Sequence, residues 1–538
     1  MQRTNTETKI AVFIALATMT AVQLAGAVTG PVAVTGGQIA GVPGSDPSVM
    51  VFKGIPFAAP PVGDLRWRAP QPVAAWQGIR NADQFGNSCI QTVVRERKPW
   101  TYEFMTHNSI SEDCLYLNVW TAAGRPEERR PVYVFIYGGG NTEGSTAVPV
   151  YDGGTLARKE IVVVTVNYRL GLLGFFTHPE LTREASYRAS GNYGILDLIA
   201  ALKWVHDNIA AFGGDPAKVT VGGQSAGAAN THVLTASPLA TGLFRGAVAE
   251  SGSTIARGAN RKLAEQEQMG VKFAAAKGAS DLRALRAMSW QHLEAPLASS
   301  GAGSSAPNYR FTTVIDGYVL PSAIDEVFTQ KKQNDVPTLT GSNKDEGGAS
   351  PHPDVTLEQF RTLATARYAE SAEEFLKLYP AKTDEEAAIA QNRAARDASR
   401  VSTYLWAIER EKTARTKEWT YFWDHALPGP DADKYGAFHT SEVPYVLGAL
   451  AMSDRPFTAD DRRIADGMTS YWANFVAKGD PNGEGLPRWS AVSEKPGFTM
   501  ELGDKTSPIP VAGDDAKLKF WEKYYSRPRA PLPRPAAQ

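Results

Sequence analysis

Residues 212–230 read "FGGDPAKVTVGGQSAGAAN", and the interpretation of the whole chain depends on this stretch. It contains one Gly-x-Ser-x-Gly pattern, formed by Gly223, Ser225 and Gly227. "KVTVGG" before the serine predicts a short strand, and "AGAANTHVLTA" after it predicts a helix. A serine on a sharp turn between a strand and a helix exposes its hydroxyl as a nucleophile. The five letters alone are weak, because the chain has 48 glycines among 538 residues, so the surroundings must decide.

The surrounding sequence has the pattern of an α/β fold. "PVYVFIYGGG" (131–140) and "EIVVVTVNYR" (160–169) are nearly continuous apolar runs rich in β-branched residues. Such runs are typical of central strands that are covered on both faces. Residues 192–214 carry apolar side chains at helical spacing and end in two glycines. We therefore predict an α/β fold with a large, mostly parallel central sheet and helices on both faces.

The regions before and after this core have different patterns. Residues 28–130 contain shorter strand-like pieces and many turns, which predict a β-rich edge leading into the sheet. Residues 354–415 are mostly helical in pattern, and "EWTYFWDH" (418–425) predicts another strand. No internal repeat and no clear linker interrupts the chain. We therefore expect a single domain over residues 28–525.

Both ends of the chain are expected to lie outside this domain. "MQRTNTETK" carries Arg3 and Lys9, an apolar run covers residues 10–22, and small residues follow. This pattern is typical of a signal peptide, here residues 1–27, and the run is shorter than the roughly 20 residues that a bilayer requires. We expect export to the periplasm or the medium, with no stable membrane anchor. The tail, residues 526–538, is rich in proline.

Composition excludes some partners and limits the metal chemistry. Lys and Arg total 56 and Asp and Glu total 57, so no net field attracts nucleic acid. The only two cysteines are Cys89 and Cys114. In an exported chain they suggest one disulfide, although two buried thiols remain an alternative. His107 is the one histidine near them, so a structural zinc site is not expected.

If Ser225 is the nucleophile of an ester hydrolase, the chain must also supply backbone N–H donors for the oxyanion. They come from a loop after an earlier strand and from the residue after the nucleophile. Gly138, Gly139 and Gly140 follow a predicted strand directly, and Ala226 follows Ser225. A dinucleotide-binding loop would place its third glycine at position 143, which is Glu143. A plain glycine turn remains the alternative.

The base must be a histidine, and the usual chain order is serine, acid, histidine. The histidines that follow the serine are His232, His292, His352, His425 and His439. His439 lies in a glycine-containing loop and is favoured over His425, which ends a predicted strand, although the pattern does not decide between them. For the acid, Asp345 and Glu346 share a turn after "VPTLTG", and the residues alone leave both open.

Taken together, these segments resemble the type-B carboxylesterases over about residues 34–525. The resemblance rests on several blocks in the family's order, among them "GIPFAAPPVGDLRWRAP", "SEDCLYLNVW", "VNYRLGLLGFF", "GSNKDEG" and "HTSEVPYVLG". It implies one α/β-hydrolase domain that hydrolyses carboxylic esters with no cofactor and no metal. The residues it implies are Ser225 as nucleophile, Glu346 as acid, His439 as base, Gly139, Gly140 and Ala226 as the oxyanion hole, and Cys89–Cys114 as a disulfide.

Two positions depart from the family's pattern beside the reacting ester. Gln224 stands where the family usually has Glu, and Asn141 stands where it usually has an aromatic residue. The loss of a carboxylate and of an apolar wall favours polar esters, especially those with free carboxylates on the acyl part, such as a tricarballylate ester. A carboxylesterase or lipase of broad specificity is the alternative. A binding module of the same fold without activity is a more remote one, because the nucleophile and the histidine are both present.

Overall fold

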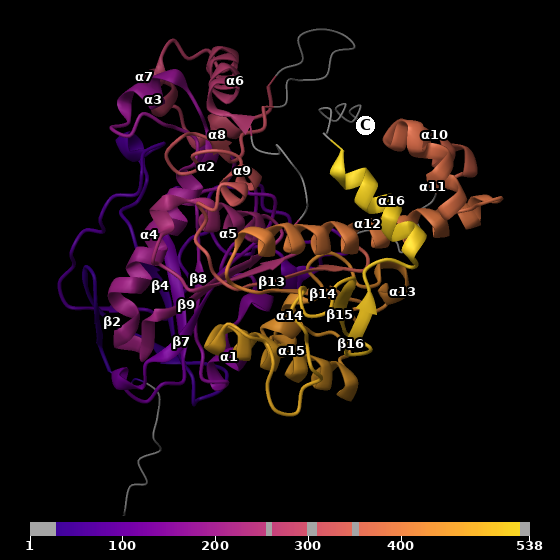
Figure 1. The fold of residues 1–538 in the computed structure, drawn as a ribbon. Coiled ribbons are helices and arrows are strands. Elements are labelled where there is room, and N and C mark those ends of the chain that lie inside the picture. The colour runs from indigo at the N-terminus through magenta and orange to yellow at the C-terminus, as the bar shows by residue number, and fades with distance from the viewer. Residues whose placement is uncertain (1–27, 29, 254–260, 298–308, 347–354, 528–538) are drawn as a thin grey trace, which may run out of the picture.

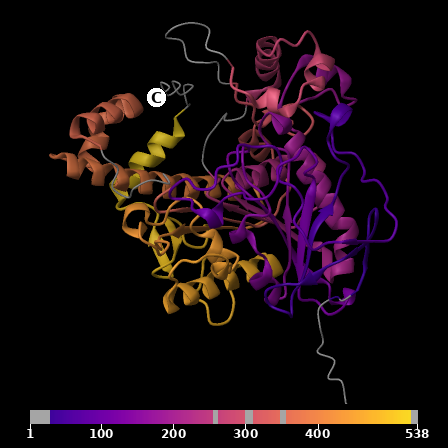
Figure 2. The same cartoon turned by 180° about the vertical axis from the view of Figure 1, so that it is seen from behind.

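A computed structural model of the protein describes residues 28, 30–253, 261–297, 309–346 and 355–527. The predicted signal peptide and nearly all of the proline-rich tail therefore lie outside the described residues. One large sheet forms the centre of the fold, with helices around it (Figure 1), and the view from behind shows the same arrangement (Figure 2).

The central sheet has eleven strands. In order across the sheet they are β16 (Ser507–Pro510), β15 (Phe498–Leu502), β14 (Glu418–Trp423), β13 (Thr338–Asn343), β10 (Gly246–Glu250), β9 (Gly214–Gln224), β7 (Arg130–Ile136), β8 (Val162–Val166), β6 (Tyr116–Thr121), β4 (Met50–Pro56) and β3 (Val42–Pro43). A smaller sheet has β2 (Gly37–Ala40) between β1 (Val32–Val34) and β5 (Ile79–Asn81), and another pairs β11 (Arg261–Lys262) with β12 (Val314–Ile315).

The pairing confirms a sheet that is parallel at its centre. All pairs from β15 through β8 are parallel, whereas β3, β4, β6 and β8 pair antiparallel with one another, as do β15 and β16. Every residue of β8 is buried, as expected for a Val-rich strand covered on both faces. The sheet is therefore mixed, with its antiparallel pairs confined to the two edges.

Helices lie on both faces of this sheet. On one face are α4 (Tyr193–Asn208), α5 (Ala226–Ala236) and α12 (Asp384–Thr413); on the other are α1 (Gly154–Arg158) and α15 (Ala459–Lys478) (Figure 1). The remaining α-helices are α2 (Gly171–Phe175), α3 (Pro179–Glu184), α6 (Leu263–Ala276), α7 (Leu282–Ala287), α8 (Trp290–Glu294), α9 (Ile324–Thr329), α10 (Leu357–Tyr368), α11 (Ala372–Leu378), α13 (Ala432–Tyr435), α14 (Val443–Val446) and α16 (Asp515–Ser526).

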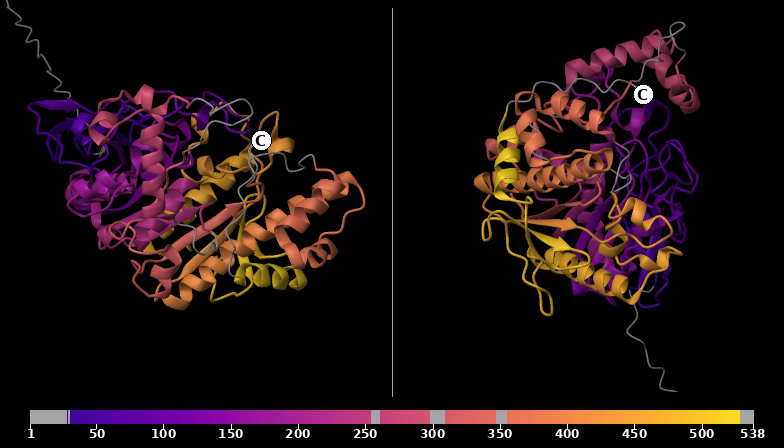
Figure 3. Two further views of the ribbon diagram at one scale, coloured as in Figure 1. Left: turned by 90° about the horizontal axis from the view of Figure 1, so that it is seen from above. Right: turned by 90° about the vertical axis from the view of Figure 1, so that its right-hand side faces the viewer.

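Two hydrophobic clusters stabilise the described chain. The larger one surrounds the central strands, and the second lies among α9, α10, α11, α12 and α16. In the second cluster Trp521 packs against Tyr368 and Phe375 and donates a hydrogen bond to Tyr379. Of these helices, α10, α11 and α16 lie together on the side of the molecule away from the N-terminal strands (Figure 3). Because α12 contacts both β13 and β14, it connects the two clusters. The assignment of residues 28–525 to a single domain stays a prediction.

Several predicted elements are found with shifted bounds. The strand at 218–223 extends from Gly214 to Gln224, and the strand at 418–425 ends at Trp423. The predicted helical region 354–415 contains α10, α11 and α12. The sequence analysis did not predict β15 and β16, nor the helices α6–α8 that follow β11.

Cys89 and Cys114 form the predicted disulfide, and both residues are buried. Their sequence separation is 25 residues, and in the chain-entropy model a loop of this length stabilises the folded state by about 3 kcal/mol. We therefore expect reduction to lower the free energy of unfolding by this amount, measured as a shift of the urea midpoint. A Cys89→Ala/Cys114→Ala variant should not respond to reductant. An unchanged midpoint for the reduced native protein would contradict the expectation.

Among the residues that the structure describes, no helix is both long and apolar enough to cross a bilayer.

Candidate active site

Ser225 occupies the sharp turn between β9 and α5. Its backbone has φ 58° and ψ −120°, a conformation that a residue other than glycine rarely adopts. Ser225 N–H donates to the carbonyl of Glu250 at the end of β10, and its own carbonyl accepts from Ala229 in α5. These bonds hold the strained turn in place, as a nucleophile elbow requires.

The two glycines of the pattern are required by close packing of the backbone. A Cβ on Gly223 would lie 2.4 Å from the carbonyl oxygen of Ile136, and one on Gly227 would lie 2.0 Å from the same atom. Ile136 is the last residue of β7, the strand next to β9. Any side chain at either position would therefore displace the serine turn from the neighbouring strand.

The loop after β7 presents free N–H groups near this turn. Gly139 and Gly140 both have positive φ, 87° and 64°, and a Cβ on Gly139 would lie 2.1 Å from the carbonyl oxygen of Glu143. Within the described part of the chain, the N–H groups of Gly139, Gly140 and Ala226 have no hydrogen-bond acceptor. Unpaired backbone donors of this kind suit the oxygen of a tetrahedral intermediate.

His439 and Glu346 are brought together although 93 residues separate them. Nδ1 of His439 lies 2.5 Å from Oε2 of Glu346, and the other carboxylate oxygen accepts from Asn343 N–H at 2.7 Å. Desolvation would raise the pKa of Glu346, but the charge and hydrogen bond of His439 hold it below the ordinary value. Desolvation would likewise lower the pKa of His439, and the Glu346 carboxylate raises it above its ordinary value.

Asp345, the other candidate acid, faces a different set of partners. Its carboxylate accepts from Arg396 of α12 at 2.8 Å and from the N–H of Ala437 at 3.0 Å. These contacts connect the turn after β13 to the segment that carries His439. Asp345 therefore lies in position to support the two side chains of the pair without contacting His439 itself.

Ser225 and His439 line the same cavity, whose volume is about 270 Å³. Within the described chain no hydrogen bond joins them, and Nε2 of His439 instead forms a hydrogen bond with the side-chain nitrogen of Gln224, at 3.3 Å. The buried Gln224 side chain also accepts from the hydroxyl of Thr440 at 3.3 Å. A loose serine–histidine contact is common in unliganded active sites and tightens when substrate binds.

Asn141 follows Gly140 in the chain, but it lines a different and larger cavity than Ser225 and His439 do. It has φ 60° and is buried, and its side-chain amide pairs reciprocally with that of Asn230 in α5 at 2.9 and 3.3 Å. Tyr168 also donates to its carbonyl oxygen at 3.2 Å. Protein groups therefore engage the amide of Asn141. The cavity that it lines, with residues of α5, α9 and α12, has a volume of about 740 Å³.

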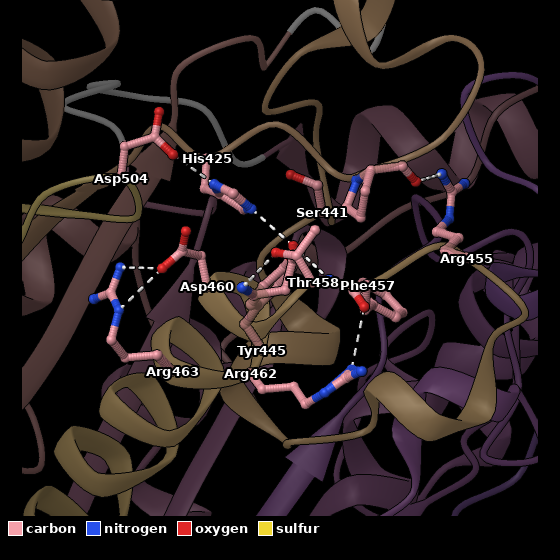
Figure 4. Close-up of polar contacts among 12 residues, drawn as sticks. His425, Ser441, Tyr445, Arg455, Phe457, Thr458, Asp460, Arg462, Arg463 and Asp504 are labelled. Atoms are coloured by element: carbon pink, nitrogen blue, oxygen red, sulfur yellow. Dashed lines mark hydrogen bonds and ion pairs between the residues drawn. The ribbon is translucent and has the colours of Figure 1, made fainter.

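His425, the rival candidate for the base, lies in another cluster of side chains (Figure 4). Its Nδ1 lies 2.6 Å from Asp504 and its Nε2 lies 2.9 Å from Asp461. Asp461 also accepts from the hydroxyl of Tyr445 and from Thr458 at the start of α15. Both ring nitrogens of His425 are therefore occupied by carboxylates, with no serine among their partners.

The sequence analysis did not identify Glu442 and Trp100 as neighbours of the candidate base. Glu442 is buried, accepts from the side-chain amide of Asn343 at 2.5 Å, and has a pKa raised by burial. Trp100 donates through its indole N–H to the carbonyl of His439 at 3.0 Å. Glu442 lies three residues after His439 in the block "HTSEVPYVLG". This short spacing is the signal in the sequence that could have indicated a carboxylate close to the histidine.

No metal site is present in the described ranges: no group of three or more His, Cys, Asp or Glu side chains there could hold an ion.

The fold and this arrangement define an α/β hydrolase. The family model described as "Carboxylesterase family" matches residues 28–521, and the chain therefore belongs to the carboxylesterase family. It is 37% identical to fumonisin B1 esterase of Sphingopyxis macrogoltabida, covering 90% of this chain and 89% of that protein. It is also 31% identical to liver carboxylesterase 1 of Oryctolagus cuniculus, with 92% of each chain covered. The chain is a carboxylic ester hydrolase.

The raised pKa of His439 gives a prediction for the pH dependence. A general base must be neutral, and His439 is protonated below its pKa, which Glu346 holds above 6.5. We therefore expect kcat/KM for a neutral ester to fall as the pH drops, with the midpoint of the acid limb above pH 6.5. A pH profile with ethyl pentanoate measures this. A midpoint clearly below 6.5 would show that another group controls the limb.

Proposed function

We propose that Ser225, His439 and Glu346 hydrolyse esters through an acyl-enzyme, and that the preferred esters carry free carboxylates on the acyl part. The proposal includes the tricarballylate esters of fumonisins as substrates. One observation carries the ester chemistry. Ser225, on its strained turn, lines the same cavity as His439, and His439 is hydrogen-bonded to the carboxylate of Glu346.

In this mechanism the hydroxyl of Ser225 attacks the ester carbonyl and its proton passes to Nε2 of His439. Glu346 holds the Nδ1–H of His439, which fixes the tautomer and stabilises the imidazolium. The N–H groups of Gly139, Gly140 and Ala226 stabilise the oxyanion. His439 then protonates the departing alcohol, and water activated by the same histidine releases the acid from Ser225.

The substrate class is supported by the neutral lining beside the serine. Gln224 is an uncharged amide in contact with His439, so an acyl carboxylate meets no repulsion there. Glu143, the acid that lines the same cavity, is paired with Arg97. A relative at 37% identity is named for fumonisin B1. The liver carboxylesterase relatives support broad ester hydrolysis as the second candidate.

Export is also proposed, on the basis of the pattern in residues 1–27 and the disulfide between Cys89 and Cys114. Disulfides persist in oxidising compartments. N-terminal sequencing of the mature protein, after expression of the full chain in a bacterium, tests it, and a retained Met1 in the purified protein would contradict it.

The substrate proposal is tested with a matched pair of esters. Monoethyl glutarate and ethyl pentanoate have acyl chains of the same length and differ in a terminal carboxylate against a methyl group. We expect a higher kcat/KM for the glutarate ester by pH-stat assay, and release of the acid from fumonisin B1 by mass spectrometry. Preference for ethyl pentanoate would favour the broad carboxylesterase instead.

Replacing Gln224 with Glu is expected to weaken this preference. Two like charges about 5 Å apart repel by roughly 3 kcal/mol at an effective dielectric near 20, which corresponds to about 100-fold in rate. We therefore expect Gln224→Glu to lower the glutarate-to-pentanoate ratio of kcat/KM by about tenfold to 100-fold. Thr440→Val, which removes only the hydroxyl that binds Gln224, serves as the neutral control. An unchanged ratio in Gln224→Glu would remove position 224 from the account of specificity.

A further inference from the structure

We propose that Arg310 forms a subsite for a carboxylate of the substrate's acyl group, directly beside the oxyanion loop. This inference rests on the proposed function, because it assigns the group that recognises the anionic acyl part. Neither the resemblance nor the quoted motifs include residue 310.

The backbone around Arg310 is fixed by aromatic packing on both sides. Tyr309 packs edge-on against Phe273, and the buried Phe311 packs against both Phe176 and Phe273. Between these anchors the side chain of Arg310 is exposed. The main chain of this segment is therefore held in place while the guanidinium remains accessible to a ligand.

The guanidinium lies over the residue that supplies one of the oxyanion donors. A Cβ built on Gly140 would lie 3.8 Å from Nη2 of Arg310 and 3.7 Å from Oγ1 of Thr142. Because a Cβ lies ~2.5 Å from the nitrogen of its own residue, Nη2 is no more than about 6.5 Å from the Gly140 nitrogen. A cation and a hydroxyl thus lie close to the residue whose N–H is proposed to bind the ester oxygen.

The charge of Arg310 is available for a ligand. Across the described ranges, no carboxylate forms an ion pair or a hydrogen bond with Arg310, whereas Arg97, the arginine lining the serine cavity, is paired with Glu143. An arginine presents a planar fork of donors that matches a carboxylate with two parallel hydrogen bonds. Arg310 is therefore suited to bind an anion that arrives with the substrate.

The dimensions of the acyl group fit this separation. In an extended five-carbon diacid, the free carboxyl carbon lies about 5 Å from the ester carbonyl carbon. With the carbonyl oxygen on the Gly140 N–H, a carboxylate at that distance can reach the guanidinium. The same contact would orient the acyl chain and bring the ester carbon to Ser225, so it contributes to binding and to positioning.

The test compares Arg310→Gln and Arg310→Lys with the unchanged protein, using monoethyl glutarate and ethyl pentanoate. Hydrogen bonds to charged groups are typically worth enough to change binding by about tenfold to 100-fold. We expect Arg310→Gln to lower the glutarate-to-pentanoate ratio of kcat/KM by that factor with little change for ethyl pentanoate. Arg310→Lys should retain part of the preference. Arg361→Gln, an exposed position on α10, controls for the loss of one positive charge.

Each outcome has one reading. An unchanged protein that prefers the glutarate ester and loses this preference in Arg310→Gln supports the subsite. If the preference exists but persists in Arg310→Gln, or is lost equally in Arg361→Gln, the subsite is overturned and the proposed substrate class survives. Loss in Arg97→Gln alone would assign the role to the other arginine. If the unchanged protein shows no preference, both the subsite and the substrate class fail, while ester hydrolysis itself stands. Activity on ethyl pentanoate reports whether each variant is folded.

Discussion

Ser225→Ala is expected to lower kcat for ester hydrolysis by roughly 10⁴-fold or more, with the protein still folded. The variant removes the only atom proposed to form the acyl-enzyme, and the free N–H groups of Gly140 and Ala226 remain in place. Alanine fits the φ of 58° about as well as serine does, so the turn should persist. Steady-state turnover of ethyl pentanoate measures the loss, and the thermal midpoint checks the fold.

The chain offers a matched control for this prediction. Elsewhere in the protein, the buried Ser253 and His232 form a serine–histidine hydrogen bond, with 2.6 Å between Oγ and Nε2. Ser253→Ala should leave turnover near that of the unchanged protein. His439→Ala should lose activity to the same degree as Ser225→Ala, and the double variant should be no worse, because the two residues act as one unit. Near-normal turnover in Ser225→Ala would overturn the whole assignment.

The central strands could be predicted because burial on both faces leaves a clear mark on the sequence. β8 is Val-Val-Val-Thr-Val with every residue buried, and no amphipathic helix has that composition. The turn at Ser225 could be predicted because the approach of Ile136 excludes side chains at Gly223 and Gly227, which makes the pattern a direct record of packing.

The edges and the second helical cluster could not be predicted in the same way. β16 is a partly exposed edge strand of four residues, and β15 beside it has five, and strands this short leave little periodicity. The cluster of α10, α11, α12 and α16 depends on aromatic contacts between segments far apart in sequence, such as Tyr368 with Trp521. No local pattern records such contacts, because only the folded chain brings them together.

The residues of the candidate site also differ in how far the sequence alone could predict them. Motif residues such as Ser225 and Gly140 are marked by their local sequence, whereas the choice between Asp345 and Glu346 depends on which carboxylate faces His439 in space. The resemblance selected Glu346, and in the structure its Oε2 lies 2.5 Å from Nδ1 of His439. Arg310 carries no local signal at all, because only the folded chain places it over Gly140.

Glu346→Gln is therefore the second variant with a large expected effect, a loss of roughly 10³- to 10⁴-fold in kcat. A neutral amide can present its NH₂ group to Nδ1 of His439, which then favours the tautomer that cannot accept the serine proton. Turnover of ethyl pentanoate measures the loss. Because Glu346 also raises the pKa of His439, the acid limb of any residual activity should move to lower pH.

Asp345→Asn distinguishes the role of the acid from that of its neighbour. Asp345 accepts from Arg396 and from the N–H of Ala437, and an asparagine oxygen can keep one of these bonds. This variant should lose stability, seen as a lower thermal midpoint, while kcat falls by less than about tenfold and the acid limb stays in place. A large loss of kcat in Asp345→Asn with near-normal turnover in Glu346→Gln would assign the acid to Asp345. The shift of the acid limb separates the two cases even where both variants are less stable, because Glu346 is the main group that raises the pKa of His439 and Asp345 is not among the groups that shift it.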